Sequence, residues 1–150
     1  MASQWHLAQL NIAHGRYPLD APEMEDFRAR LDEINALAEA SQGFVWRLKD
    51  DAGAAMSFRL FDDPKLLINL TVWTTPDALS NYVYRTAHAE PMRLRKRWFE
   101  PAPEATFVLW WIPAGTTPSL VEAGERLLHL RKHGPTAEAF TFKDRFPPRD

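Results

Sequence analysis

One predicted helix carries side chains that could do acid–base chemistry. Its members follow one another at spacings of three, four and three residues: Arg85, His88, Met92 and Arg95. They share one stripe if the helix continues through Pro91. A histidine titrates near pH 6.5 and can act as base, acid or metal ligand, and a neighbouring arginine would hold a substrate carboxylate or phenolate. The alternative is a solvated helix face on which His88 is an ordinary hydrogen-bonded residue.

Large aromatic residues recur in the predicted strands. They are Phe44, Trp46, Phe58, Trp73, Phe107, Trp110 and Trp111. Successive residues of a strand point to opposite faces, so Trp110 and Trp111 must lie on opposite sides of the sheet, one toward the helices and one toward a partner. These rings favour either core and dimer packing or the wall of a ligand site.

Polar residues interrupt two otherwise apolar strands. Gln9 and Asn11 lie on the first, and Asn69 and Thr71 lie on the most hydrophobic one. Burying a polar side chain without a hydrogen-bond partner costs roughly 2–7 kcal/mol. Asn69 therefore either bonds a cross-strand neighbour or faces a polar cavity, where its amide could stabilise an enolate.

The elements that must position these residues alternate between strands and helices. Strands are predicted at 5–12, 44–48, 56–60, 67–73 and 106–112, and helices at 24–38, from 76 to a break at Pro91, at 92–99, and from Ser119 or Thr117 onward. Asp20 and Glu23 resemble a capping box, and Gly43 is a plausible helix stop. A tail from Gly134 holds the short apolar piece 139–142, which forms either an edge strand or an arm.

This order predicts an α+β domain spanning 1–150, with 134–150 as a tail or arm. It is a ferredoxin-like split βαβ arrangement of antiparallel strands, with an extra hairpin strand and helices on one face. The strand at 106–112 is apolar on both sides, so the second face also needs a cover. One chain of this length is expected to lack a spare helix for it, so the sequence predicts a homodimer that packs sheet to sheet.

Composition narrows the partners. The net charge of −2 argues against nucleic-acid or membrane-surface binding, and the absence of cysteine excludes thiolate metal sites and disulfides. No apolar run approaches the roughly 18 residues of a membrane span, and the N-terminus shows no signal-peptide pattern. A cytoplasmic protein without a bound metal, which takes a small-molecule ligand, is the expectation.

Several segments together resemble the dimeric α+β barrel superfamily, and within it an uncharacterised bacterial family of antibiotic-biosynthesis monooxygenase-like proteins. The segments are WHLAQLNI at 5–12, SQGFVWRL at 41–48, NLTVW at 69–73, YVYRTAH at 82–88, MRLRKRWF at 92–99 and LWWIPAG at 109–115. The resemblance covers about residues 5 to 142 and implies the barrel fold. The superfamily includes cofactor-free oxygenases, haem enzymes and non-catalytic proteins, so it leaves the function open.

The resemblance implies a cofactor-free, monooxygenase-like enzyme that binds a flat, apolar or aromatic substrate between sheet and helices. His88 would be the base, and Arg85 or Asn69 would stabilise the substrate anion. The substrate-binding residues would be Trp46, Trp73, Tyr84, Met92, Arg95 and Trp110. One alternative is a haem enzyme with His88 as axial ligand, and another is a dimer that binds a small ligand without catalysis.

Overall fold

The fold was analysed in a computed structural model, which describes residues 4–18, 20–49, 65–89 and 97–148. Of residues 86–89 only the backbone is described. The hairpin strand predicted at 56–60 lies outside the described residues, as does most of the helical stretch predicted at 92–99.

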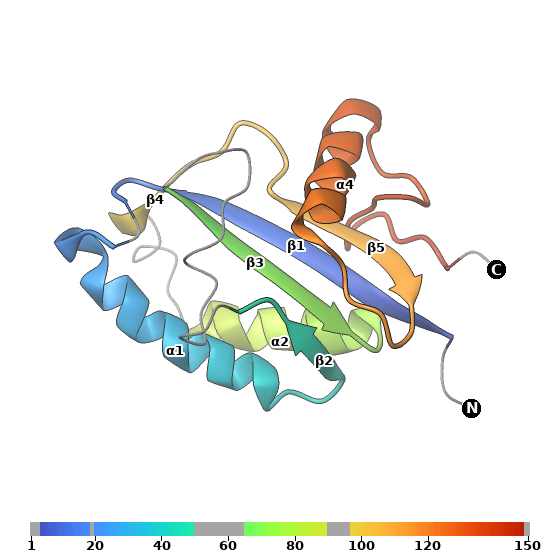
Figure 1. Ribbon diagram of the computed structural model, residues 1–150, viewed down its shortest axis with the longest axis horizontal. Helices are drawn as coiled ribbons and strands as arrows, with labels where there is room; N and C mark the ends of the chain where they lie inside the picture. Colours follow the sequence, from blue (N-terminus) through green and yellow to red (C-terminus); the bar gives the residue numbers. More distant parts are fainter. Residues whose placement is uncertain (1–3, 19, 50–64, 90–96, 149–150) are drawn as a thin grey trace.

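The described elements follow the predicted order. They are β1 (Trp5–Gly15), a 3-10 turn η1 (Pro22–Met24), α1 (Glu25–Glu39), β2 (Phe44–Arg47), β3 (Leu66–Trp73), α2 (Pro76–Ala89), β4 (Phe99–Glu100), β5 (Phe107–Pro113) and α4 (Leu120–His133) (Figure 1). None of the helices in the described ranges is long and apolar enough to cross a lipid bilayer.

The N-terminal ends of α1 and α4 test the capping residues that were predicted from the sequence. Ser119 caps α4 by accepting a hydrogen bond from the backbone N–H of Glu122 at 3.1 Å, so one of the two predicted caps is confirmed. The capping box predicted at Asp20 is wrong, because α1 begins after the 3-10 turn with Met24 at its N-cap and no side-chain cap. Gly43 has a φ of 88° and lies in the turn before β2, beyond the end of α1.

The sheet has the strand order β2-β3-β1-β5, and every neighbouring pair is antiparallel. The short β4 adds to the end of β1 at His14 and Gly15. The central strand β1 therefore pairs with β3 and β5, neither of which is its neighbour in sequence, as the split βαβ arrangement requires. The predicted α+β, ferredoxin-like fold class is confirmed.

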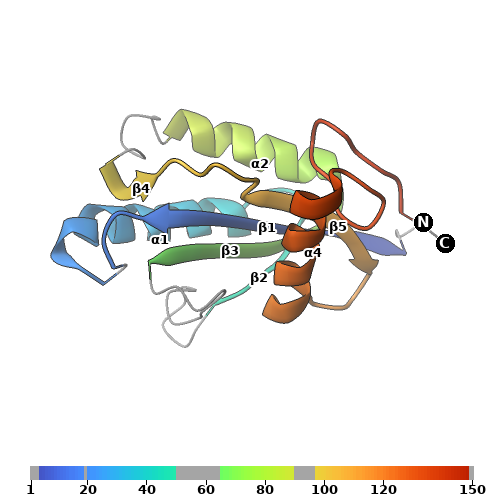
Figure 2. The ribbon, with the colours of Figure 1, turned by 90° about the horizontal axis from the view of Figure 1, so that it is seen from above.

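Helices cover both faces of this sheet. Helices α1 and α2 lie on one side and α4 lies on the other (Figures 1 and 2). The α4 face buries Leu10, Val72 and Trp110 against Ala123 and Leu127. The expectation that one chain has no helix for the second face is wrong, because the additional C-terminal helix α4 supplies the cover.

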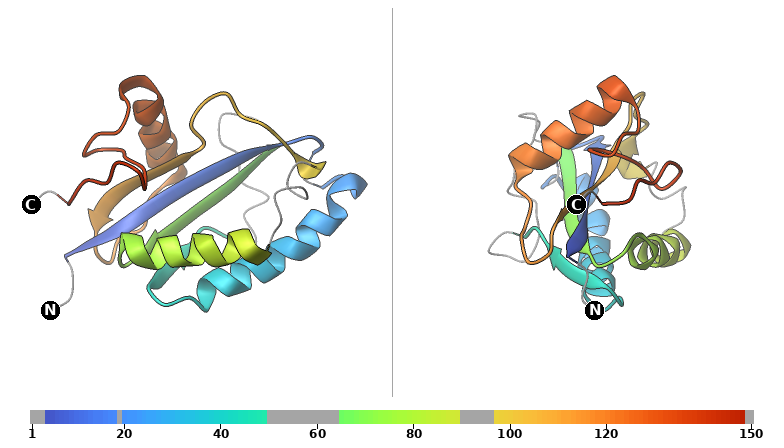
Figure 3. Two further views of the ribbon diagram at one scale, coloured as in Figure 1. Left: turned by 180° about the vertical axis from the view of Figure 1, so that it is seen from behind. Right: turned by 90° about the vertical axis from the view of Figure 1, so that its right-hand side faces the viewer.

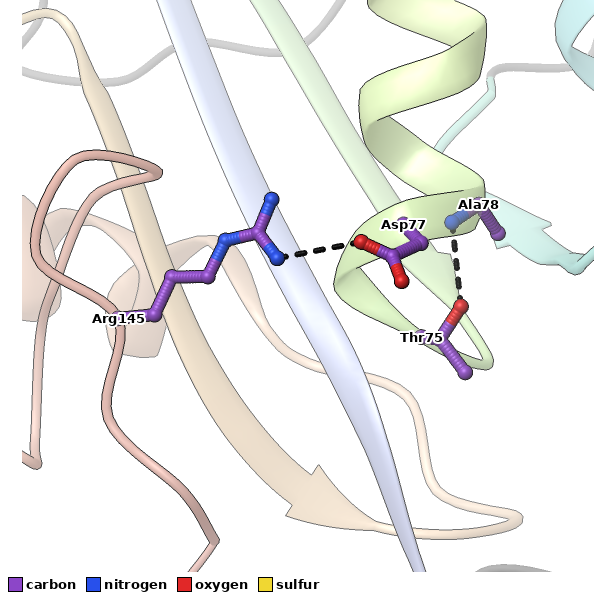
Figure 4. Close-up of polar contacts among 4 residues, drawn as sticks. All are labelled: Thr75, Asp77, Ala78 and Arg145. Atoms are coloured by element: carbon purple, nitrogen blue, oxygen red, sulfur yellow. Dashed lines mark hydrogen bonds and ion pairs between the residues drawn. The ribbon is translucent and has the colours of Figure 1, made fainter.

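The C-terminal tail packs along β5 (Figure 3). Phe140 exchanges two backbone hydrogen bonds with Leu109, of 2.8 and 2.9 Å, and its side chain is fully buried. Trp111 donates from Nε1 to the backbone oxygen of Phe146 at 2.8 Å. Farther along, Arg145 pairs with Asp77 in the first turn of α2 at 3.2 Å (Figure 4). The tail thus covers β5 on the same face of the sheet as α1 and α2.

Candidate small-molecule site

A cavity of about 200 Å³ lies between the sheet and helices α1 and α2. Its apolar lining comes from α1 (Phe27, Leu31, Ile34), from α2 (Leu79, Val83) and from the strands β1, β3, β4 and β5 (Ile12, Ala13, Leu67, Phe99, Phe107). Its polar lining consists of Gln9, Asn11, Asn69 and Tyr82. An engineered apolar cavity of about 150 Å³ accepts benzene, so this space suits a compact, flat molecule.

The polar residues of the two central strands meet because of the strand register. Asn11 is opposite Asn69, and Gln9 is opposite Thr71. Side chains two residues apart on a strand share a face, so all four project toward α1 and α2. The polar positions noted in the sequence therefore form one patch at the cavity side of the sheet.

Hydrogen bonds fix this patch. Gln9 donates from Nε2 to Thr71 Oγ1 at 2.7 Å and to Asn69 Oδ1 at 3.0 Å. Trp73 donates from Nε1 to the same Thr71 hydroxyl at 2.8 Å. Both alternatives for Asn69 are thus realised, because it bonds a cross-strand neighbour and also lines the cavity.

The amide nitrogen of Asn69 is the group available to a ligand. Its oxygen accepts from Gln9, and within the described residues its Nδ2 makes no hydrogen bond. Because Gln9 holds the amide plane in place, Nδ2 is a donor positioned before any ligand arrives. The described lining of the cavity contains no Asp, Glu, Lys, Arg or His.

The tryptophans predicted for the substrate site are not among the described residues that line this cavity, and their role stays a prediction. Trp73 is fully buried, stacks on Tyr82 at 5.1 Å between ring centroids and meets Phe44 edge-on at 5.5 Å. Trp46 and Trp110 pack on the opposite face of the sheet, in the cluster under α4. Trp110 donates from Nε1 to Glu122 Oε2 at 2.7 Å. Trp46 and Trp110 do not reach the cavity because their side chains point to the opposite face of the sheet. Trp73 is enclosed by its contacts with Phe44 and Tyr82.

Trp110 and Trp111 do lie on opposite faces, as predicted from strand periodicity. Trp111 packs with the cluster around Leu109 and Phe140, on the side of α1, α2 and the tail. Trp110 meets α4 of its own chain, where a partner subunit was expected.

The stripe predicted on α2 is only partly described. Tyr84 is 67% exposed and Arg85 is exposed, and neither lines the cavity. His88 belongs to the backbone of α2, but its side chain lies outside the described residues. Met92 and Arg95 also lie outside them. The roles predicted for these residues stay predictions.

A second, much smaller cavity of about 20 Å³ adjoins the first. Both are lined by Leu31, Leu67 and Asn69, and the smaller one adds Asn35 and Arg47. The sequence reasoning missed these two residues. Asn35 follows Leu31 by four residues and precedes Ala38 by three, so an amide in the apolar stripe of α1 was the available signal.

A haem does not fit the described cavity. Sites for drug-sized ligands measure roughly 300–1,000 Å³, and a haem is among the larger of such ligands, whereas this cavity measures about 200 Å³. No histidine is among its described lining residues. In the described part of the chain, no group of three or more His, Cys, Asp or Glu residues could hold a metal ion.

The fold and the site define a ferredoxin-like α+β protein with a hollow on one face of its sheet. Residues 6–150 match the model of a family described as a domain of unknown function, DUF3291, and the chain belongs to this family. The prediction of an uncharacterised family is thereby confirmed. Among curated proteins, none matches the chain.

Solved structures with a similar fold include a conserved protein from Methanosarcina mazei Go1, with a TM-score of 0.50, 10% identity and coverage of 73% of this chain and 93% of that one. A candidate antibiotic biosynthesis monooxygenase from Chloroflexus aurantiacus J-10-fl gives a TM-score of 0.44 at 9% identity, over 77% and 98% of the two chains. SnoaB, a cofactor-independent oxygenase from Streptomyces nogalater, gives 0.41 at 18% identity, over 75% and 95%.

Proposed function

We propose that this protein is a small-molecule enzyme of the cofactor-independent monooxygenase kind, acting on a compact, flat and largely apolar substrate. The observation that carries the proposal is the apolar cavity with the fixed amide of Asn69 in its wall. An apolar enclosure strengthens a hydrogen bond to developing negative charge, because little water is present to screen it. The cavity size favours a substrate of one or two rings over a larger polyketide.

The proposed reaction needs only a substrate that can form a carbanion, and dioxygen. A base removes a proton from a CH₂ group beside a carbonyl, and the enolate passes one electron to O₂. The resulting radical and superoxide combine to a peroxide, which loses water to leave a ketone, so CH₂ and O₂ become C=O and H₂O. Asn69 would stabilise the enolate oxygen through Nδ2. The sequence left Arg85 and Asn69 as alternatives for this role, and we propose Asn69 because Arg85 is exposed.

His88 is the base in this proposal, as predicted from the sequence. General-base catalysis contributes about 10²- to 10⁴-fold to rate. His88→Ala should therefore lower turnover at least about a hundredfold while the protein remains folded, measured as oxygen uptake with an enolisable aromatic ketone. Arg97→Gln, at a side chain that is 60% exposed, is the matched control and should leave turnover unchanged. Undiminished oxygen uptake by His88→Ala would remove the histidine from the mechanism.

The contribution of Asn69 can be tested separately. Asn69→Ala removes the donor from the cavity wall, so turnover should fall by about ten- to a hundredfold, in line with the loss of one positioned donor to an anion. Asn69→Asp keeps the shape and places a negative charge beside the enolate, so its turnover should be lower still. Equal turnover in the wild type and both variants would contradict the proposed role.

Ligand binding without catalysis is a second candidate, favoured by the absence of charged side chains from the described lining of the cavity. The two functions separate in one measurement. Binding of an aromatic ketone in calorimetry without oxygen uptake would favour the non-catalytic function. Oxygen uptake that stops when the cavity is filled by a non-enolisable analogue would favour the enzyme.

We also propose that the protein is a homodimer and acts in the cytoplasm, as the sequence analysis predicted. The sheet face that was expected to pair with a partner is already covered by α4. The support for a dimer therefore comes from the superfamily resemblance. Exposed Val121 and Leu128 on α4, at 70% and 50% exposure, offer an apolar surface for a partner. Native mass spectrometry of the purified chain should give twice the 17.3 kDa subunit mass, and a mass of one subunit would contradict the dimer.

A further inference from the structure

We infer that the ligand of the cavity carries a carboxylate, which occupies the small cavity between Arg47, Asn35 and Asn69. This inference rests on the proposed function and adds the substrate class, an aromatic or otherwise apolar carboxylic acid. The ring would lie in the larger cavity and the acid group in the smaller one.

The two cavities are joined at shared walls. Leu31 of α1 and Leu67 and Asn69 of β3 line both. A molecule in the larger space that extends past Asn69 therefore reaches Asn35 and Arg47. Besides Leu48 and Ile68, the smaller cavity adds the amide of Asn35 and the positive charge of Arg47, and these two groups suit the polar end of an amphipathic ligand.

Arg47 gives the smaller cavity its charge. Its side chain is only 10% exposed, and its Nη2 lies 3.5 Å from Oε1 of Glu39. Glu39 is 45% exposed, so water screens that ion pair and weakens it. A carboxylate inside the cavity would meet the guanidinium away from bulk water, where a charge-assisted hydrogen bond is stronger.

Two amides complete the site. Asn35 is 6% exposed on α1, and Asn69 has its oxygen occupied by Gln9. Asn35 can donate an N–H to a carboxylate oxygen. Nδ2 of Asn69 has two N–H groups, so one can reach the carboxylate while the other serves the enolate oxygen. The volume of about 20 Å³ matches one water-sized group, so it takes one oxygen of the acid group but no ring, and the rest of the acid group lies where the two cavities join.

A matched pair of ligands tests this inference on the full chain. Phenylacetate and phenylacetamide have the same shape and differ in charge, and calorimetry gives the affinity of each. We expect the wild type to bind phenylacetate about tenfold more tightly. Arg47→Gln and Asn35→Leu should each reduce this preference, the former abolishing it, while the affinity for phenylacetamide changes less than about threefold. Arg131→Gln is the control. The Arg131 side chain is similarly shielded, at 19% exposure, and pairs with Glu104 at 3.3 Å, and it lines neither cavity.

The outcomes separate this inference from the proposed function. Equal binding of both ligands by the wild type, or a tenfold preference that survives in both variants, overturns the acid site and leaves the cavity as a ligand site. Failure of both ligands to bind overturns the inference together with the proposed cavity function. Should Arg47→Gln fail to fold, Arg47→Lys and Asn35→Leu decide the matter, since loss of the preference in the latter supports the site and its retention overturns it.

Discussion

The two faces of the sheet are built from the same strands and differ in content. Under α4, the strand residues of the cluster are apolar, and only the indoles of Trp46 and Trp110 have a polar atom in their side chains. Toward α1 and α2, Gln9, Asn11, Asn69 and Thr71 occupy the centre of the sheet beside a cavity. The comparison shows that one face is closely packed and apolar, whereas the other combines polar strand residues with a cavity.

The polar face remains stable because its most deeply buried polar side chains, Gln9 and Thr71, are hydrogen-bonded. Thr71 is 1% exposed and accepts from both Gln9 and Trp73. A buried hydrogen bond contributes about 0.5–1.5 kcal/mol, but an unpaired buried donor costs about 1–3 kcal/mol. The network therefore avoids a penalty more than it adds stability, whereas the α4 face gains from apolar area removed from water.

The largest effect is expected from the α4 face. Trp110→Ala should destabilise the protein by about 3–5 kcal/mol, because it leaves a cavity in a closely packed cluster and removes the partner of Glu122. Denaturant unfolding measures this loss. The affinity of the remaining folded protein for phenylacetamide should be unchanged, and a loss of affinity without a loss of stability would mean that Trp110 forms part of the ligand site after all.

A smaller loss is expected in the polar network. Thr71→Val keeps the shape but leaves the indole N–H of Trp73 unpaired and one bond of Gln9 unmade, so the free energy of unfolding should fall by about 1–3 kcal/mol. Thr116→Val, at an exposed hydroxyl bonded to Pro113, is the control and should have little effect. A Thr71→Val protein as stable as the wild type would show that the network contributes nothing to the fold.

The smallest change in stability is expected at the cavity wall. Ala13 lines the larger cavity, so Ala13→Val fills part of it and should change the free energy of unfolding by less than about 1 kcal/mol. Its affinity for phenylacetamide should nevertheless drop severalfold, because the added methyl groups occupy ligand space. Thermal unfolding with and without the ligand measures both quantities, and undiminished affinity would place the ligand elsewhere.

Sequence reasoning succeeded where the signal was local. The elements, the cap at Ser119 and the opposite orientations of Trp110 and Trp111 follow from backbone periodicity and side-chain capping. It was less successful at the site. Asn69 was identified from its place in an apolar strand, but Arg47 and Asn35 were missed, because nothing in their own segments shows that they approach Asn69 from two other elements.

The sequence by itself determined that Gln9, Asn11, Asn69 and Thr71 share one face of the sheet once their strands pair, because side chains alternate along every strand. It also determined that the centre of the other face is apolar, with Ala8, Leu10 and Ile12 on the first strand. Only the tertiary structure decided that α4 covers the apolar face and that α1 and α2 leave a hollow over the polar one. The physical reason is that alternation is set by local backbone geometry, whereas the contact between a helix and a sheet depends on side chains far apart in the chain.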